Sequence, residues 1–328
     1  MNWKFRKAEE PKTTKQNKAN NEHQLGDERY SAIQKMVGGP DSISRPSEAY
    51  RIPELLQDIR LLDLLELSGS TVQASRLLSL SQPTVSRRYR LLAQDFGLLQ
   101  EPRQFKYCRY GTSEAMRWLR LGCRAHRLEA GVVRIGTDLL HQPLLAGVPG
   151  LLTVPARFRS IHRWVNLVRE GVLDAALVSG LEIHPAGSQI DLGGLQLVEL
   201  GSLPLTLAVR GDKSSADSPF PTVLLPMRSI AAGLHRALQG LNLSLRAAGH
   251  SCNSAEQWLQ RLNNHGLAIP IYHHPASWAF WCQQLSPLPL FRSIEVGVGL
   301  LLPDEVHPAG VLLHKLEAFR QRIHSTKA

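Results

Sequence analysis

The 328-residue chain lacks any uninterrupted apolar run near the ~20 residues that a membrane-spanning helix requires. Its first residues, MNWKFRKAEEPKTTKQNKANNEHQ, also lack the apolar core of a secretory signal. We therefore expect a cytoplasmic protein. At this length the chain can form two or three domains with full hydrophobic cores. A hydrophobic fraction of 43% and a charged fraction of 20% are typical of soluble globular proteins.

Cysteine is scarce as well, and the four cysteines are scattered: Cys108, Cys123, Cys252 and Cys282. Because no two of them form a CxxC pair, the sequence predicts neither a disulfide framework nor a zinc site. His273 and His274 are adjacent, which puts them on different faces of any regular element, and no third ligand follows at helical or strand spacing. A pair of loop histidines is therefore favoured over a metal site. We expect no cofactor.

The chain also lacks the common motifs of enzymes built on α/β folds. GxGxxG, the P-loop and GxSxG do not occur. Asp138 and His141 are close in sequence, but no nucleophile accompanies them, and a single Asp or His near a helix start is more often a cap or a surface residue. An enzyme would need residues that only the fold brings together, so we expect the protein not to be an enzyme.

Positive charge, by contrast, is in excess and is concentrated in one part of the chain. The formal net charge is +10, and the segment from Arg76 to Arg127 holds eleven Lys/Arg against three Asp/Glu. Residues 132 to 328 carry sixteen basic and thirteen acidic groups. A basic block beside a nearly balanced remainder favours a polyanion-binding domain on a larger neutral one. Charge alone is equally compatible with a soluble basic face.

The periodicity of apolar residues predicts two helices after a polar start. Residues 1–50 contain few large apolar groups and end at GGPDSISRPSEAY, so we expect a disordered polar extension. PELLQDIRLLDLLELSGS then predicts an amphipathic helix that ends at Ser68-Gly69-Ser70. Its apolar stripe comprises Leu55, Leu56, Ile59, Leu62 and Leu65. TVQASRLL predicts a second, short helix, followed by a tight turn at Ser79-Leu80-Ser81.

A third helix is predicted over residues 82–95. Ser81 is a suitable N-cap, and Pro83 lies in the first turn, where a missing N–H costs nothing. Gly97 ends the helix. The inner stripe comprises Val85, Tyr89, Leu92 and Phe96.

With that stripe in the core, the polar N-terminal side of the third helix must face outward. A short turn followed by a helix with such a face is typical of a helix-turn-helix, whose second helix enters the DNA major groove. Arginine binds guanine edges or phosphates, and hydroxyls bind either. The residues expected at the DNA surface are Gln82, Pro83, Thr84, Ser86, Arg87 and Arg88.

Two further basic segments follow the predicted recognition helix. EPRQFKYCRYG alternates basic and aromatic residues, and a hairpin wing here would place Arg103, Lys106 and Arg109 near flanking phosphates. An ordinary hairpin with its aromatics in the core is also compatible. TSEAMRWLRLGCRAHRLEA predicts a helix with an apolar side of Met116, Leu119 and Cys123, and a basic stripe of Arg117, Arg120, Arg124 and Arg127. This stripe is either in contact with phosphates or simply solvated.

The segment SGSTVQASRLLSLSQPTVSRRYRLL resembles the winged helix-turn-helix of the LysR-type transcriptional regulators. The matching positions are Ala74, Leu78, Leu80, Ser81, Gln82, Pro83, Val85, Ser86 and Arg87. Weaker similarity continues in GVVRIGTDLL, SIHRWVNLVREGVLDAALVSG, LPLTLAVRGD and NSAEQWLQRLNNHGLAIPIY. The likeness runs from about residue 52 to the C-terminus.

The resemblance implies three parts after the extension. They are a winged helix-turn-helix at 51–111, a linker helix at 112–131 and a periplasmic-binding-protein-like effector domain at 132–328. That domain would have two α/β lobes, one of about 132–203 with 283–328 and one of about 204–282. Apart from the resemblance, short apolar runs separated by helical patterns favour an α/β fold on their own: VVRIG, AALVSG, LTLAV, LAIPIY and VGVGLLL.

In folds of this kind a small ligand lies beyond the carboxyl ends of strands, near helix N-termini. Thr137 and Asp138 directly follow VVRIG, and Ser160 starts the next helical pattern, so these three are candidate effector-binding residues. Each could instead be a plain N-cap, which is the favoured interpretation, although capping and ligand contact are compatible. An ionised Asp138 would disfavour an anionic ligand.

The chain departs from the family pattern at several positions. Only about twenty residues separate Tyr110 from Val132, which is short for the family's dimerising linker helix. The other departures are Thr71 for an aromatic residue, Ser75 for a small apolar one, Ser79 for the glycine of the turn, LLQEPR at the wing, Asn263 for an apolar residue and Ala268 for a glycine.

The sequence thus predicts a sequence-specific DNA-binding transcriptional regulator. Its partners would be double-stranded DNA, a small-molecule effector of unknown identity and a second copy of the chain, since such proteins act as homo-oligomers. The departures motivate an alternative, a ligand-binding or protein-interaction module whose helix-turn-helix is degenerate.

Overall fold

The computed structural model describes residues 52–98, 110–152, 154–183, 190–210, 222–249, 255–262, 267–281, 285–288, 294–304 and 311–324. The chain divides into one unit of Met1–Ala49 and a second of Tyr50–Ala328, and all described residues belong to the second. The expected disordered extension and the wing residues Arg103, Lys106 and Arg109 lie outside the described residues. Within those ranges, no helix is long and apolar enough to cross a membrane.

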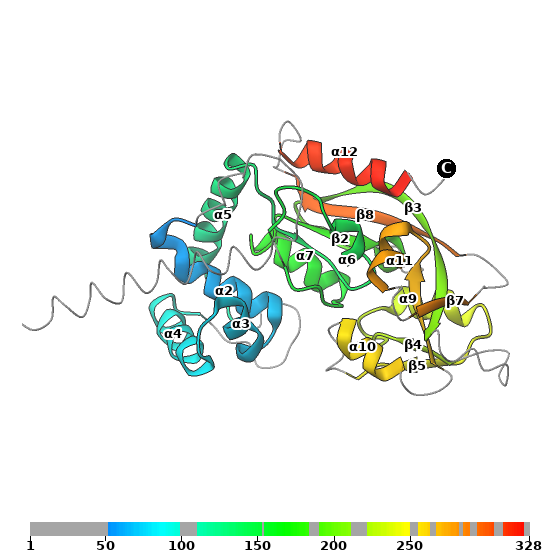
Figure 1. Ribbon diagram of the computed structural model, residues 1–328. Helices are drawn as coiled ribbons and strands as arrows, with labels where there is room; N and C mark the ends of the chain where they lie inside the picture. Colours follow the sequence, from blue (N-terminus) through cyan, green and yellow to red (C-terminus); the bar gives the residue numbers. More distant parts are fainter. Residues whose placement is uncertain are drawn as a thin grey trace, which may run out of the picture. The chain divides into compact units, whose positions relative to one another are not determined.

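The N-terminal part of the second unit is a small helical domain (Figure 1). It consists of η1 (Glu54–Leu56), α2 (Gln57–Ser68), α3 (Thr71–Leu78) and α4 (Gln82–Asp95). The positions of all three predicted helices are confirmed. Each begins or ends on a local signal: α2 stops at Gly69, whose φ of 67° is left-handed, and the Ser70 side chain caps α3. The core of this domain includes Ile59, Leu62, Leu65, Ala74, Val85 and Leu92, together with Met116 and Cys123 from the next helix.

That next helix, α5 (Glu114–Glu129), connects the helical domain to a mixed sheet. The strands are β1 (Ile135–Gly136), β2 (Ala175–Ser179), β3 (Leu195–Arg210), β4 (Thr222–Leu225), β5 (Leu245–Ala247), β6 (Leu267–Tyr272), β7 (Leu285–Leu288) and β8 (Ile294–Pro303). Their order in the sheet is β1-β2-β8-β3-β6-β4-β5, with β7 paired to β3.

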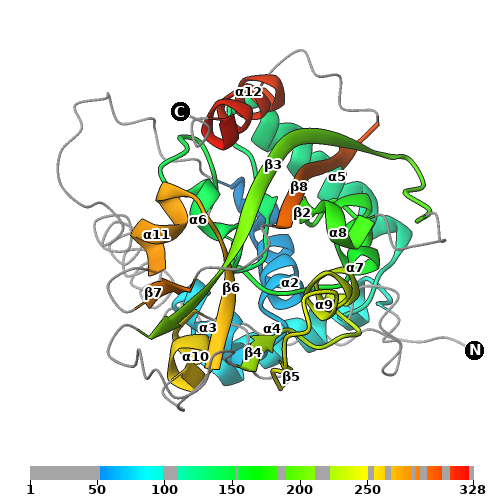
Figure 2. The same cartoon turned by 90° about the vertical axis from the view of Figure 1, so that its right-hand side faces the viewer.

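Parallel pairs stand at both ends of this order, and antiparallel strands join them. β1 pairs with β2, and β4 with β5 and β6, in parallel. β3 pairs with β8 along Leu195–Leu205 and with β6 along Leu205–Val209, so this one strand crosses from one half of the sheet to the other (Figure 2). The predicted α/β class is confirmed, and the lobe boundaries stay a prediction.

The remaining helices are α6 (Gln142–Leu145), α7 (Ile161–Arg169), α8 (Gly180–Ile183), α9 (Ala232–Gln239), α10 (Ala255–Leu262), α11 (Pro275–Trp281) and α12 (Val311–His324). One large core cluster links residues of β1, β3, β4, β6 and β8 with α9, α10 and α12. A second cluster lies between α7 and β2 and includes Leu67 of α2. The helical domain therefore shares a core with the sheet domain.

The two adjacent histidines face different surroundings, as their spacing predicts. His274 is buried, with Nε2 3.0 Å from the carbonyl oxygen of Arg322, whereas His273 is exposed and packs edge-on against Trp278. The described part of the chain contains no group of three or more His, Cys, Asp or Glu residues that could hold a metal ion.

Candidate nucleic-acid interface and ligand pocket

The start of α4 is built as the sequence predicts. Ser81 is the N-cap, and its Oγ accepts a hydrogen bond from the backbone N of Thr84 at 3.3 Å. The same Oγ lies 2.8 Å from Thr84 Oγ1, and Pro83 occupies the first turn. The Ser81 side chain thus satisfies the N–H group of Thr84, one of those that have no partner within the helix, and Pro83 has no N–H to satisfy.

The buried side of α4 determines which residues remain outside. Val85 is 0% exposed and Leu92 8%, whereas Gln82, Pro83, Arg87 and Arg88 are exposed. Thr84 and Ser86 are half-buried, and Gln82 donates through Nε2 to Thr71 Oγ1 at 3.2 Å. The six residues proposed to contact DNA are thus all at least partly accessible, and their contact with DNA stays a prediction.

Two arginines of α4 differ in their electrostatic surroundings. Arg88 forms a 3.0 Å ion pair with Asp58, in which the side chains are 47% and 45% exposed. A pair this exposed contributes only about 0–1 kcal/mol, so exchanging Asp58 for a phosphate costs little. Arg87 is exposed and forms no ion pair within the described ranges of the chain.

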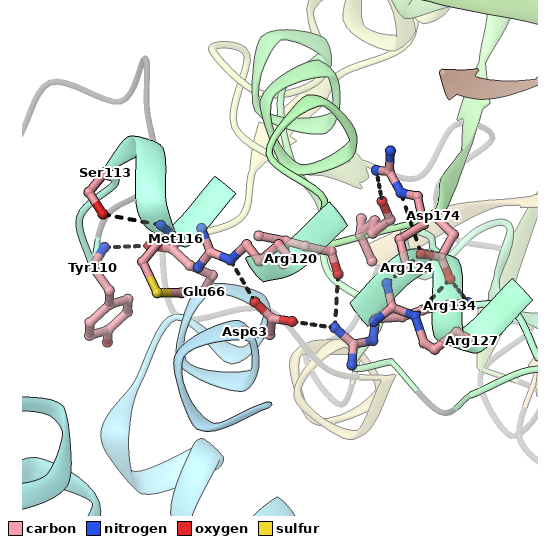
Figure 3. A network of polar contacts seen from close by, with 12 residues as sticks. Asp63, Glu66, Tyr110, Ser113, Met116, Arg120, Arg124, Arg127, Arg134 and Asp174 are labelled. Carbon is pink, nitrogen blue, oxygen red and sulfur yellow. Dashed lines mark hydrogen bonds and ion pairs between the residues drawn. The ribbon is translucent and has the colours of Figure 1, made fainter. Parts of the chain in front are cut away.

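The expectation that the basic stripe of α5 is either solvated or in contact with phosphates is wrong for three of its four arginines. Arg120, Arg124 and Arg127 are 2%, 7% and 1% exposed. Arg120 Nε donates to Asp63 Oδ1 at 2.8 Å, and Arg127 Nε donates to Asp174 Oδ2 at 3.0 Å. Figure 3 shows these side chains turned toward α2 and toward the segment before β2. Because they compensate buried carboxylates, they are unavailable to DNA.

The carboxylates in this network come from both domains. Asp63 of α2, 1% exposed, also accepts from Arg134 NH1 at 2.6 Å, beside β1. Asp174 accepts from the backbone N of Arg134 at 2.7 Å (Figure 3). Arg124 donates to the carbonyl oxygens of Val168 and Leu173. A buried charge needs such compensation because an unpaired one costs several kcal/mol.

A pocket lies where the parallel strands β1 and β2 end. Its space of about 390 Å³ includes open solvent, and apolar side chains form much of the wall. Its polar lining consists of Asp138, Arg159, Ser179, Glu182 and Tyr272. Asp138 follows β1 and Ser179 ends β2, so the pocket stands beyond the carboxyl ends of two parallel strands, as expected for a ligand site in an α/β sheet.

Asp138 starts a hydrogen-bonded chain that reaches Tyr272, another pocket-lining residue, through the buried His141. Its Oδ1 accepts from the backbone N atoms of Leu140 and His141, each at 3.0 Å, and lies 2.7 Å from His141 Nδ1. His141 Nε2 is 2.8 Å from the hydroxyl of Tyr272 on β6. Burial raises the pKa of Tyr272 well above 10, with Asp138 adding to the rise and a hydrogen bond from Ser179 opposing it. The tyrosine therefore stays a neutral hydrogen-bonding group.

Glu182 joins α8 to the first turn of α9. Its carboxylate accepts from the backbone N atoms of Gly233 at 3.1 Å and Leu234 at 2.9 Å. α8 and α9 approach so closely that a Cβ at Gly233 would stand 1.9 Å from the carbonyl oxygen of Leu181. The Glu182 side chain therefore satisfies two of the free N–H groups in the first turn of α9.

The three predicted effector residues have different roles in the structure. Asp138 lines the pocket and also caps backbone N–H groups, so both interpretations of it agree with the geometry. Thr137 is buried, at 2% exposed. Ser160 occupies the N-cap position of α7, but the Ser160 side chain makes no capping hydrogen bond. Neither residue lines the pocket. Sequence reasoning does not find Arg159, Glu182 and Tyr272, because a sequence does not show that α8 packs against α9 or that β6 lies in the same sheet as β1 and β2.

No family model and no curated protein matches the chain in sequence. Similar solved structures include CbnR, a LysR-family transcriptional regulator, at 16% identity and TM-score 0.44 over 82% of this chain and 99% of that chain. CbnR in complex with its target DNA has 16% identity and TM-score 0.41, covering 82% and 99%. ArgP from Mycobacterium tuberculosis has 15% identity and TM-score 0.43, covering 81% and 96%.

Proposed function

We propose that the protein is a LysR-type transcriptional regulator that acts in the cytoplasm and binds double-stranded DNA through α4. The observation that carries this proposal is the N-terminal face of α4, which is polar, accessible and backed by the fully buried Val85. A helix held this way in a helix-turn-helix presents its first turns to the major groove.

The chemistry of the face suits that role. Arg87, exposed near the start of α4, can bind guanine O6 and N7 with two hydrogen bonds. Ser81 fixes the hydroxyl of Thr84, which can then contact a phosphate or a base edge. If the segment around Arg103, Lys106 and Arg109 forms the expected wing, these residues would add charge for the flanking backbone. Because several phosphates are neutralised, affinity falls steeply with salt.

The test begins with selection of bound sequences from a random DNA library, followed by measurement of affinity for an enriched and a scrambled duplex. We expect Arg87→Ala and Thr84→Ala to weaken binding to the enriched duplex, by about 1–3 kcal/mol for Arg87 because a bidentate base contact is lost. Binding to the scrambled duplex should change much less. Lys106→Ala should weaken both duplexes alike.

A suitable control is Arg246→Ala, which removes an exposed arginine on β5, far along the chain from α4. Equal losses on both duplexes for Arg87, Thr84 and Lys106 would contradict the assigned roles. Recovery of no enriched sequence would favour the alternative, a ligand-binding or protein-interaction module with a degenerate helix-turn-helix.

A small-molecule effector would bind in the pocket at Asp138, with Glu182 and Tyr272 supplying further polar contacts. The supporting observation is that these groups converge beyond the ends of β1 and β2. Two carboxylates against one arginine favour a ligand that carries hydrogen-bond donors. Binding of such a ligand would shift the balance between conformations of the regulator.

A second copy of the chain is the proposed protein partner, docked on the outer face of α5. The exposed residues there recur at spacings of three and four: Ala115, Trp118, Gly122, Ala125 and Glu129. Such spacing forms a seam that a second helix can pack against. Trp118 is 64% exposed, an unusual exposure for so large an apolar group.

A further inference from the structure

Three arginines converge on the last turn of α2, two from the segment that leads into α7 and one from the first turn of α7 itself. Arg157 NH1 donates to the carbonyl oxygen of Ser68 at 2.6 Å, and Arg159 donates to that of Leu67. Arg163 pairs with the buried carboxylate of Glu66. We call Arg157, Arg159 and Arg163 the arginine clamp.

The clamp suits the end of a helix. The last carbonyl groups of a helix have no partner within it and carry partial negative charge, so cations are favoured there. The fit is close, because a Cβ at Gly69 would stand 2.0 Å from Arg157 NH1. Burial, together with Arg157 and Arg163, lowers the pKa of Arg159 to about 9 while Glu66 opposes this effect, so the guanidinium is still charged at neutral pH. Three neighbouring cations repel one another, and the acceptors on α2 compensate this repulsion.

The same segment forms part of the pocket wall. Phe158 and Arg159 both line the pocket. The backbone N of Arg157 donates to the carbonyl oxygen of Thr137 at 3.0 Å, directly before Asp138. One stretch of three residues therefore contacts α2 on one side and the pocket on the other.

A second group of ion pairs joins the two domains beside the arginine clamp. Asp63 of α2 is buried between Arg120 of α5 and Arg134 next to β1, at 2.8 and 2.6 Å. Separating α2 from the sheet domain would take Arg134 from this carboxylate, which makes partial opening unfavourable. The docked arrangement leaves Arg87 exposed, so it positions α4 without covering its DNA-binding face.

We propose that the arginine clamp positions the helix-turn-helix on the sheet domain and couples it to the pocket, so that a change at either site alters the other. The coupling to a ligand and to DNA rests on the proposed function, whereas the clamp itself does not. Arg157 and Arg163 are positioning residues that act through α2. Because coupling free energy is reciprocal, loosening α2 must also loosen the pocket wall, and a change in the pocket must reach α2.

The test is hydrogen–deuterium exchange of the full chain, without DNA or ligand, in the double variant Arg157→Ala/Arg163→Ala. We expect exchange in α2 to rise about tenfold or more, because two charged hydrogen-bonding groups are lost. Exchange should also rise in the pocket-lining stretches around Asp138 and Glu182. The matched control is Arg169→Ala, whose guanidinium instead donates to the carbonyl oxygens of Gly193 and Leu192.

Two further variants keep the proposal testable if the double variant does not fold. Arg159→Lys retains the charge but loses the planar fork, and should raise exchange in α2 and at the pocket. Asp138→Asn, which changes only the pocket, should alter exchange in α2.

Unchanged exchange in α2, or a change that stays in α2 and never reaches the pocket, would overturn the proposal. These outcomes are distinct from a failure of the proposed function, which would show as an absence of selected DNA sequences with the exchange results intact.

Discussion

Glu182 experiences two opposing effects on its ionisation. Burial raises the pKa of its carboxyl group, while the N–H groups of Leu234 and Gly233 act in the opposite direction. The pKa of Glu182 is therefore above 4.5 in the folded chain. At a pH between 4.5 and this raised pKa, the folded state keeps a proton that the unfolded state has released. We therefore expect this residue's contribution to the free energy of unfolding to decrease as the pH rises from about 4.5 through the raised pKa.

Thermal unfolding of Glu182→Gln between pH 4 and pH 7 measures this effect, since glutamine does not titrate. The variant should lose that part of the pH dependence, whereas Glu256→Gln, at an exposed glutamate of α10, should retain it. Identical pH profiles for the wild type and Glu182→Gln would show that the carboxyl group has no net shift.

The buried carboxylates show what a sequence cannot predict at the scale of a residue. Asp63 and Glu66 occur in LLDLLELS, and an amphipathic pattern places charged groups on the solvent side. Asp63 is instead buried against Arg120 and Arg134, which are 57 and 71 positions away. Nothing local indicates these partners, and the same pairing explains why the arginines of α5 were assigned wrongly to the surface.

The turn between α3 and α4 contains a strained residue. Ser79 has a φ of 53° and closes α3 in the left-handed region, which costs a non-glycine residue roughly 1–2 kcal/mol. We expect Ser79→Gly to stabilise the chain by roughly 0.5 kcal/mol, because part of the relief is offset by the greater backbone entropy of glycine. A rise of about 1–2 °C in the midpoint of thermal unfolding would follow.

Ser70→Gly is the matched control, since it makes the same chemical change at the N-cap of α3. The Ser70 hydroxyl accepts from the backbone N of Gln73 at 3.1 Å, so its loss should lower stability by a few tenths of a kcal/mol. Changes of the same sign at both positions would contradict the strain at Ser79.

At the scale of elements, prediction succeeded where signals are local. The bounds of α4 were predicted as 82–95 because Ser81, Pro83 and Gly97 mark its ends within the sequence itself. The sheet is different, since β3 pairs with β6, β7 and β8, which lie far along the chain. Apolar runs indicate that strands exist but not which strands meet. The pocket depends on those pairings, so the sequence identified Asp138 and missed Tyr272.

For the whole molecule, the short connection between the domains has a structural consequence. The linker helix α5 spans 16 residues, and its Arg120, Arg124 and Arg127 are used inside the molecule. Together with the arginine clamp, these contacts make the helical domain part of one packed unit. The proposed coupling between the pocket and α4 would therefore act through contacts within a single chain, and the other face of α5 remains exposed.

That face gives a prediction about assembly. We expect the wild type to be a dimer in solution and Trp118→Asp to weaken the dimer by about 30-fold or more, because a central tryptophan contributes about 2 kcal/mol or more to an interface. Sedimentation velocity over a range of concentrations measures the dissociation constant. Leu91→Asp is the control, since Leu91 is 56% exposed on α4 and lies outside the seam.

The monomeric Trp118→Asp variant should keep its affinity for one DNA half-site and lose the gain from two adjacent half-sites, because only a dimer can engage both at once. Two outcomes would show that α5 is not the dimer interface. In the first, the wild type remains a monomer at every concentration; in the second, the Trp118→Asp variant is as dimeric as the wild type. In the first case each chain would read a single half-site, and positioning of α4 by the arginine clamp would act within one subunit alone.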